Sequence, residues 1–359
     1  MRYQRVQIEA FAWELASDVV TTDELEDRLS PVYKALHIQP GQLEAMTGIV
    51  ERRYWAPGYA VSRGAAAAAL NLLRDTGFDA GAIEALIYGG VCRDGFEPAT
   101  ACHVAGHLED LGHTISPGAF VYDVGNACLG VLNGMVELAN RIELGQIRAG
   151  LVVSAESARE IVDAMIDQMN AHPTMDLFKT AVATMTGGSG AVAVLLTDGS
   201  FGGPSRRRLR GGAVQTAPRF HDLCVWGVER LPGQKTAEGD PSYRQTMATH
   251  SVDVLNNGVV LGRQTWETFL GRMGWSADAV DKVVSHQVGS SHRRAYLEAL
   301  EIADHKDFIA YAYLGNTGTV ALPLAAALAE QRGFIRAGDR VALLGIGSGL
   351  NCMMLGVDW

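Results

Sequence analysis

The strongest constraint on the fold is an internal duplication, in which elements of the first half of the chain recur in the same order in the second half. Three pairs of segments correspond at an offset of about 190 positions: Gly125-Asn126 with Gly315-Asn316, residues 151–153 with 341–343, and residues 83–89 with 280–286. Matched segments in one order indicate a repeated unit. We therefore expect two similar halves that face each other.

Short apolar segments alternate with helical patterns along the chain, which indicates an α/β fold whose sheets are covered on both faces. Strands are expected at residues 6–12, 83–91, 120–124, 147–155, 190–196, 212–217, 280–286, 308–312, 339–345 and 352–357. Helices are expected at residues 25–36, 62–74, 99–111, 243–273, 290–300 and 317–331, and residues 47–55 are expected to be irregular.

The glycine-rich, basic segment 197–212 is the best candidate for a linker between the halves. It divides the chain into an N-terminal half, residues 1–200, and a C-terminal half, residues 209–359. Residues 157–186 form a polar excursion between core elements, of the kind that often serves as a lid or a dimer segment.

A candidate nucleophile lies in the central unit, residues 118–156, which follows a strand–turn–helix–strand pattern. Cys128 stands where the helix begins, directly after Gly125-Asn126-Ala127. The free N–H groups and the positive end of the helix dipole there favour a thiolate. The alternative is a small buried hydrophobic residue, which is the commoner role of an isolated cysteine.

His286 and Asn316 occupy the ends of the expected strands in the second half, where open α/β sheets place their sites. An imidazole can stabilise and protonate a reacting thiolate, and an amide can donate to a developing oxyanion. The backbone N–H groups of Cys128 and of the turn 345–349, which includes Ser348 and Gly349, are candidates for an oxyanion hole. A satisfied core histidine and a turn asparagine are the alternatives for the two side chains.

Composition limits the class of protein. The 359 residues, 48% of them hydrophobic, suffice for a large core. The net charge of −10 argues against nucleic acid as a partner. Five scattered cysteines, no secretory signal pattern and no apolar run long enough to span a bilayer predict a cytoplasmic protein. Cys102, His103 and His107 lack the partners of a zinc motif, so no metal is expected.

Taken together, the segments GNAC at Cys128, HQ at His286, GNTG at Asn316 and the terminal GIGSGLNC resemble the thiolase superfamily, in its ketoacyl-ACP synthase III-like branch. The resemblance covers essentially the whole chain. It implies a five-layered αβαβα fold of two βαβαβαββ halves, an obligate dimer, and no cofactor beyond the coenzyme A of the substrate. It also implies that Cys128 accepts an acyl group, while His286 and Asn316 bind the thioester carbonyl of the second substrate.

Within this branch, the segments GIVERRYW (residues 48–55), RDGFEPATA (93–101) and ALLGIGSGLNC (342–352) are similar to the OleA family. That similarity implies a non-decarboxylative Claisen condensation of two long-chain acyl-CoA molecules to a β-keto acid, at the start of olefin or β-lactone biosynthesis. Its base is a glutamate inserted from the neighbouring subunit, which corresponds to Glu97. A carboxylate in an apolar channel has its pKa raised toward neutrality, as such a base requires.

Two differences from typical synthase III enzymes concern coenzyme A. The Trp and Arg that those enzymes place against the adenine correspond to Gln42 and Met46, so the nucleotide contacts are undefined. Ser348 matches the OleA pattern and is assigned either a supporting hydrogen bond or a simple turn role.

Three alternative functions remain open from the sequence. The first is a decarboxylative synthase that uses malonyl-ACP, and the second is an acyltransferase of the same fold. The third is a non-catalytic partner in an assembly, for example with downstream pathway enzymes. Residues 163–185 and 224–231 are the expected lining of the pockets for the acyl chains.

Overall fold

The computed structural model describes residues 1–202, 207–235 and 241–359. Strands from the two halves of the chain meet in one nine-stranded sheet. The first half contributes the order β1-β7-β6-β4-β5 and the second half the order β8-β13-β12-β11. A single register pair, Gln7 with Arg208, joins β1 to β8. The strands are β1 (Gln7–Leu15), β4 (Ala85–Gly89), β5 (Phe120–Val124), β6 (Ala149–Glu156), β7 (Gly190–Thr197), β8 (Arg208–Thr216), β11 (Lys282–Ser285), β12 (Arg340–Gly347) and β13 (Asn351–Asp358).

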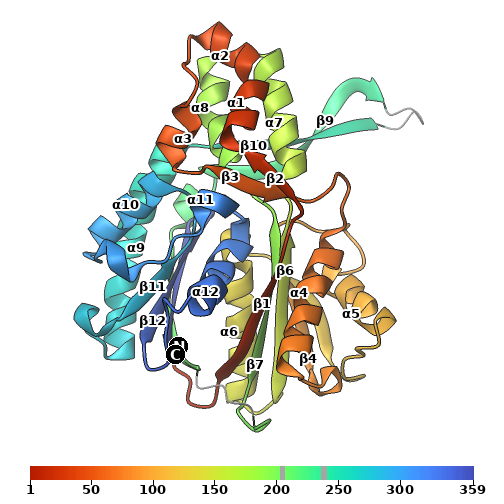
Figure 1. Cartoon of the computed structure of the whole chain (residues 1–359), viewed down its shortest axis with the longest axis vertical. Coiled ribbons are helices and arrows are strands. Elements are labelled where there is room, and N and C mark those ends of the chain that lie inside the picture. The colour runs from red at the N-terminus through yellow and green to blue at the C-terminus, as the bar shows by residue number, and fades with distance from the viewer. Residues whose placement is uncertain (203–206, 236–240) are drawn as a thin grey trace.

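Helices cover both faces of each half of this sheet (Figure 1). In the first half, α4 (Val61–Thr76) and α5 (Thr100–Asp110) pack on the outer face. In the second half, α9 (Ser251–Met273) and α10 (Ser290–Ala299) do so. Between the halves lie α6 (Gly130–Glu143) and α12 (Ala321–Gln331). These are the five αβαβα layers, so the predicted fold class is confirmed.

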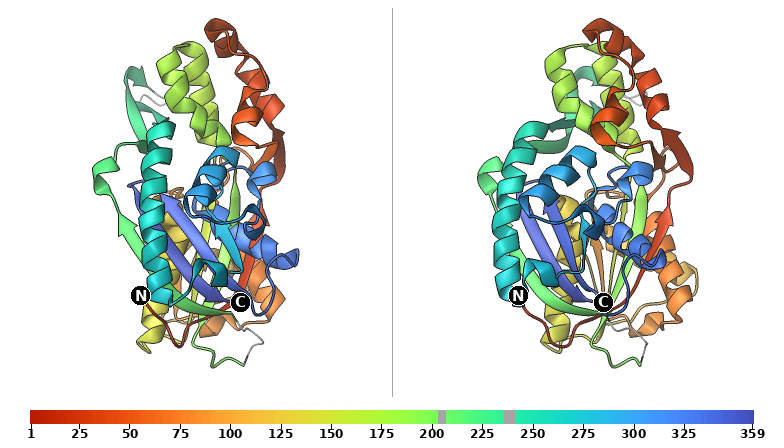
Figure 2. Two further views of the ribbon diagram at one scale, coloured as in Figure 1. Left: turned by 90° about the vertical axis from the view of Figure 1, so that its left-hand side faces the viewer. Right: turned by 60° about the vertical axis from the view of Figure 1, so that its left-hand side comes forward.

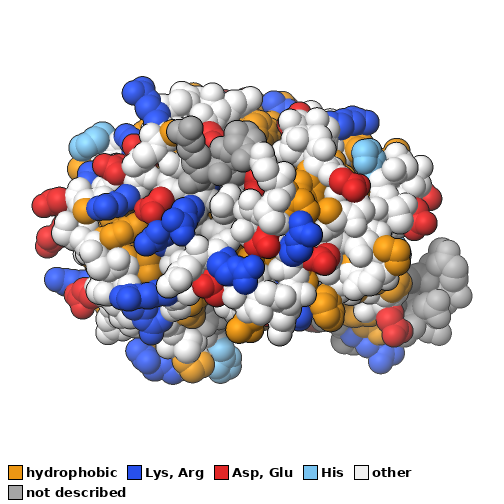
Figure 3. All heavy atoms as spheres, turned by 90° about the horizontal axis from the view of Figure 1, so that it is seen from below, with side chains coloured by type: hydrophobic (Ala, Val, Ile, Leu, Met, Phe, Trp, Pro, Cys, Tyr) orange, Lys and Arg blue, Asp and Glu red, His pale blue; other side chains and the backbone are white. Residues whose placement is uncertain are grey.

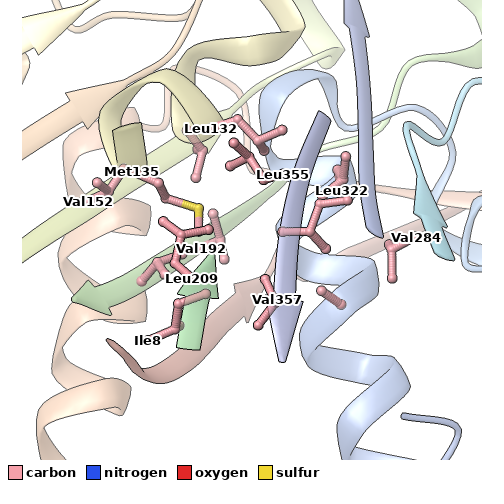
Figure 4. Packing of buried hydrophobic residues seen from close by; sticks show 14 of the residues in the cluster. Ile8, Leu132, Met135, Val152, Val192, Leu209, Val284, Leu322, Leu355 and Val357 are labelled. Atoms are coloured by element: carbon pink, nitrogen blue, oxygen red, sulfur yellow. The ribbon is translucent and has the colours of Figure 1, made fainter. Parts of the chain in front are cut away.

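The central layer contains the largest apolar cluster (Figure 4). Because successive strand residues point to opposite faces, Val152 joins this cluster, whereas Leu151 and Val153 join the outer one. The same alternation places Leu343 inside. Unbroken apolar strands therefore supply both cores of each half.

A cap stands above the layered body (Figures 1 and 2). Its elements are β2 (Asp18–Thr21), α1 (Thr22–Arg28), α2 (Ser30–Leu36), α3 (Gln42–Thr47), β3 (Glu51–Tyr54), α7 (Arg159–Ala171), α8 (Met175–Ala181), β9 (Cys224–Lys235) and β10 (Pro241–Thr249). The cap has an apolar cluster of its own, built mainly from α1 to α3, α7 and α8. The excursion at residues 157–186 is thus a helical part of the cap.

Short helices complete the described elements. The 3-10 helices are η1 (Ala80–Ala82), η2 (Ala127–Leu129), η3 (Val182–Thr186), η4 (Pro218–Phe220), η5 (Ala277–Ala279), η6 (Asp304–Lys306) and η7 (Gly318–Val320). The helix α11 (Tyr311–Leu314) is a single α-helical turn. No helix among the described residues is long and apolar enough to cross a bilayer.

The predicted helix at residues 243–273 is wrong in its first part. Residues up to Thr249 form β10, which pairs antiparallel with β9. The helix α9 then runs from Ser251 to Met273 without a break at Asn256-Asn257-Gly258, where the sequence indicated one. The segment 47–55, expected to be irregular, contains β3. Part of the predicted linker, residues 203–206, lies outside the described residues, and the division into residues 1–200 and 209–359 stays a prediction.

The predicted strand at residues 308–312 is also wrong, because side chains take the place of a strand ladder. The Gln287 Oε1 accepts from the N–H groups of Ala310 (3.1 Å) and Tyr311 (3.2 Å), and its Nε2 donates to the carbonyl of Phe308 (3.1 Å). Only Asp307 forms a bridge with β11. A buried glutamine thus satisfies the backbone of this segment from the side.

Candidate active site

Cys128 lies on η2, the turn that connects β5 to α6. A chain of amides fixes this turn. The Asn126 Nδ2 donates to Asn133 Oδ1 (3.0 Å), and the Asn351 Nδ2 donates to Asn126 Oδ1 (3.0 Å). Because Asn133 belongs to α6 and Asn351 to β13, both halves of the molecule hold Asn126, which directly precedes η2.

The glycine-rich end of β12 packs directly on Cys128. A Cβ added to Gly347 would lie 3.3 Å from the Leu129 Cγ, 3.4 Å from the Cys128 backbone N and 3.6 Å from the Cys128 Cβ, so the end of β12 lies in van der Waals contact with η2. Ser348 and Gly349 follow in the turn, and Gly349 has φ of +134°, which favours glycine. The Ser348 side chain makes no hydrogen bond with the described residues. The roles assigned to Ser348 and Gly349 stay predictions.

Asn316 is held by its backbone, which leaves part of its side chain free. Its N–H donates to the Thr186 carbonyl (2.8 Å), and its carbonyl accepts from the Gly188 N–H (2.9 Å). The Oδ1 accepts from the Gly318 N–H (3.1 Å), whereas Nδ2 donates to no described residue. Shortly afterwards the Thr319 hydroxyl accepts from the Val131 N–H of α6 (2.8 Å). This bond joins the Asn316 segment to the helix that follows Cys128.

His286 follows β11, and its N–H donates to the Leu344 carbonyl of β12 (3.0 Å). Its Nδ1 is buried and has no hydrogen-bond partner among the described residues. Burial, with a smaller effect of His292, lowers the pKa of His286 to about 4. The imidazole is therefore neutral at physiological pH and can donate one ring N–H.

Three segments thus converge where Cys128 lies: η2 itself, the end of β12 beside His286, and the turn that begins with Asn316. Each arrives from a different element, and the bonds described above connect them. A thiol, a neutral imidazole and a free amide donor are the groups needed to accept an acyl chain and to stabilise a carbonyl oxyanion.

Glu97 stands apart from this set. It lies in an exposed loop between β4 and α5, next to the fully exposed Phe96, and it makes no hydrogen bond or ion pair with the described residues of its own chain. The end of the loop is anchored, because the Asp123 carboxylate accepts from the N–H groups of Thr100 (2.9 Å) and Ala101 (2.8 Å).

The protonation state of Cys128 differs from the sequence expectation. Burial, followed by the Cys224 thiol and the Glu156 carboxyl, raises the pKa of Cys128 to about 12. The physical reason is that η2 precedes α6, which begins at Gly130, so the thiol gains little from the helix start and loses the solvation of its charged form. Cys128 therefore rests as a thiol.

Glu156 is a residue of this site that the sequence reasoning missed. Its carboxyl is buried at the end of β6 and accepts from the N–H groups of Val91 (2.9 Å) and Cys92 (3.0 Å), where the Glu97 loop begins. A Cβ added to Gly318 would lie 3.2 Å from the Glu156 Cγ. The available signal was an acidic residue that ends the apolar strand 149–156. Burial raises the pKa of Glu156.

No cluster of three or more metal-ligating side chains occurs in the described part of the chain. The His107 Nε2 instead lies 3.1 Å from the Ser62 hydroxyl.

Comparisons with known proteins place this geometry in context. Residues 270–359 match the C-terminal family model of 3-oxoacyl-[acyl-carrier-protein] synthase III. The chain is 51% identical over 361 residues to an acyl-CoA:acyl-CoA alkyltransferase of Shewanella oneidensis, with complete coverage of both chains. It is 32% identical to the enzyme of the same name from Xanthomonas campestris, again over the whole of both chains.

Solved structures give the same result. A crystal structure of a variant of Xanthomonas campestris OleA superposes with a TM-score of 0.90 at 32% identity, covering 100% of this chain and 98% of that one. Another OleA structure from that organism, with bound lauric acid and lauroyl-CoA, covers 99% of this chain and all of its own at a TM-score of 0.89 and 31% identity.

Proposed function

This chain belongs to the OleA family of acyl-CoA:acyl-CoA alkyltransferases, within the synthase III-like branch of the thiolase superfamily, and we propose that it joins two long-chain acyl-CoA molecules by a non-decarboxylative Claisen condensation. The observation that carries the proposal is the convergence of the Cys128, His286 and Asn316 segments in a chain 51% identical to such an enzyme. The product is a β-keto acid.

The first half-reaction transfers an acyl chain to Cys128. The sulfur attacks the thioester carbonyl, the bond from that carbon to the sulfur of coenzyme A breaks, and free coenzyme A leaves with the proton that Cys128 loses. N–H groups of Cys128 and of the turn at Gly347–Gly349 stabilise the tetrahedral oxyanion.

The second half-reaction needs a base, because a fatty acyl-CoA has no carboxylate whose loss would generate a carbanion. Glu97 of the partner subunit removes the Cα proton of the second acyl-CoA. The neutral His286 and the free Nδ2 of Asn316 donate hydrogen bonds to the enolate oxygen. The carbanion attacks the acyl-Cys128 carbonyl, the C–S bond to Cys128 breaks, and the released sulfur takes up the proton that Glu97 removed. Water then hydrolyses the β-ketoacyl-CoA to the β-keto acid and free coenzyme A.

A homodimer formed through β5 would supply that glutamate. All residues of β4, β6 and β7 are buried, whereas none of β5 is, and Phe120 is 49% exposed. The opposite edge, β11, is covered by the segment that Gln287 holds. Arg141 lies 4.5 Å from the Phe120 ring, and its buried Nε has no partner among the described residues. An open edge strand beside an unpaired buried donor fits an interface with a second copy.

The cap supplies the walls for the acyl chains. The segment 163–185 packs there against β10, with the Met247 N–H 3.4 Å from the Met165 sulfur and the Gln168 Nε2 3.2 Å from the Gln245 carbonyl, and Trp226 of the segment 224–231 packs against the same apolar cluster. We also propose that the protein is cytoplasmic and that it associates with downstream pathway enzymes.

The test uses purified protein with myristoyl-CoA as the only substrate. We expect two molecules of coenzyme A for each long-chain ketone that forms after spontaneous decarboxylation of the β-keto acid. The Cys128→Ala variant forms neither. The Glu97→Gln variant releases one coenzyme A per subunit in a burst but loses ketone formation by about 100-fold or more, since a general base contributes that much.

Other outcomes select other functions. Ketone formation that requires a malonyl donor and survives Glu97→Gln would mean a decarboxylative synthase. Steady release of coenzyme A without condensed product would mean a thioesterase or another acyltransferase. No acylation of Cys128 would leave the non-catalytic partner role.

A further inference from the structure

A cavity lies at the end of the molecule opposite the Cys128 site. It has a volume of about 580 Å³ and is formed where β11 begins, with Lys282, and by the loop that follows α12, with Arg332, Arg336 and Asp339. His286 is at the other end of β11. The Gly338 N–H donates to the Trp359 carbonyl (2.7 Å), which places this cavity near the C-terminus. The volume is within the range of small-molecule sites.

The charges around this cavity are unbalanced. Three cations line it, Lys282, Arg332 and Arg336, and none of them forms an ion pair with a carboxylate in the described part of the chain. The one acid, Asp339, accepts instead from the Arg336 backbone N–H (2.8 Å). In a chain with a net charge of −10, this is a local excess of positive charge. Figure 3 shows this end of the molecule, where Lys and Arg side chains are interspersed with Asp and Glu.

Two of these three cations lie over aromatic rings. The Lys282 ammonium lies 4.2 Å from the centroid of the Phe334 ring, and the Arg332 guanidinium lies 5.8 Å from that of Phe308. The two rings are 5.5 Å apart. The Arg336 Nε donates to the Gly333 carbonyl (3.1 Å). A ring attracts a cation without neutralising it, so the charges are positioned before any ligand arrives.

We propose that this cavity binds a phosphate-bearing anion with at least two negative charges. Guanidinium groups match the geometry of phosphate oxygens, and an ammonium adds a point charge. A cation already covers one face of each ring, so the phosphate groups, rather than stacking of a base, dominate recognition. The site is separate from the proposed condensation site and does not depend on it.

The test is calorimetric titration of the full-length protein with inorganic pyrophosphate, ADP and adenosine at low salt. We expect pyrophosphate and ADP to bind at one site per chain and adenosine not to bind. The double variant Lys282→Gln/Arg332→Gln weakens binding by roughly tenfold or more for each cation removed. The control Arg74→Gln/Arg263→Gln removes two exposed arginines from α4 and α9 and keeps wild-type binding.

Equal binding of pyrophosphate to the double variant and to the control would overturn the proposal, as would the absence of saturable binding to the wild-type chain. If the double variant fails to fold, Arg336→Gln provides the test, because that residue is exposed in a loop. Tighter binding of ADP than of pyrophosphate would identify nucleotides as the source of the phosphates, and equal binding would identify inorganic phosphates.

Discussion

At the proposed nucleophile, burial and the start of a helix have opposite effects on the pKa of the Cys128 thiol. The helix start favours the thiolate, but η2 separates the sulfur from the first turn of α6. Desolvation and the neighbouring Cys224 and Glu156 raise the pKa of Cys128 to about 12. Below that pH the thiol is the dominant form, so the thiolate fraction at neutral pH is small.

The pH dependence of alkylation measures this directly. We expect iodoacetamide to label Cys128 slowly at pH 7 in the absence of substrate, and the rate to rise about tenfold per pH unit up to pH 9, because only the thiolate reacts. Mass spectrometry of the Cys128 peptide gives the rate, and exposed Cys102 serves as the reference for access of the reagent. A rate that is already constant near pH 7 would mean that the helix start dominates.

Residue types and spacing were sufficient to propose Cys128, His286 and Asn316 as candidates, because their motifs lie at strand ends of a duplicated chain, and their roles stay predictions. They were not sufficient to predict protonation. The pKa of Cys128 depends on Glu156 and Cys224, which reach it from β6 and β9. That proximity is a property of the folded chain, and no spacing in the sequence encodes it.

At the level of elements, the Gln287 side chain makes the backbone hydrogen bonds that a neighbouring strand would otherwise make. Its amide bonds to the carbonyls of Ser285 (3.1 Å) and Phe308 (3.1 Å) and accepts two N–H groups from residues 310 and 311. The segment that it holds leads directly to Asn316. The composition of residues 308–312 is typical of a strand, so a strand was predicted there. In the structure the Gln287 side chain, and not a neighbouring strand, bonds to this backbone.

Replacing this side chain tests that account. The Gln287→Ala change leaves the buried N–H groups of Ala310 and Tyr311 without acceptors, and we expect it to lower the free energy of unfolding by about 2–4 kcal/mol. Urea unfolding gives the value. The control Gln264→Ala alters an exposed position on α9 and should change stability by less than about 0.5 kcal/mol. Similar losses in both variants would contradict the assigned role.

The regular elements of the body were otherwise predictable from pattern, because unbroken apolar strands and amphipathic helices alternate there. The segment Thr21–Glu24 forms a capping box at α1, and the helix expected at residues 25–36 is interrupted at Leu29. The hairpin β9–β10 was missed because its strands mix polar and apolar residues and pack on the cap from one side.

At the scale of the whole molecule, β5 is the open edge of the sheet, and the proposed dimer closes it. We expect Tyr122→Glu to place like charges across that interface and to convert the protein to monomers, observed by light scattering after size-exclusion chromatography. Acylation of Cys128 should persist, whereas ketone formation should fall by about 100-fold, since Glu97 no longer reaches a second site.

The matched control introduces the same charge elsewhere. Leu144→Glu replaces an apolar residue that is 73% exposed just after α6, and this variant should remain dimeric and active. A wild-type chain of one-subunit mass that forms ketone would show that the base acts within one chain, and the dimer proposal would fail.

The separate apolar cluster of the cap has an evolutionary consequence. Because it shares none of its buried residues with the three clusters of the layered body, substitutions within this cluster reshape the cap without removing side chains from the cores around the sheet. Preferences for fatty acids of different length or branching can therefore diverge among descendants of one ancestor while the bond-forming chemistry is inherited unchanged.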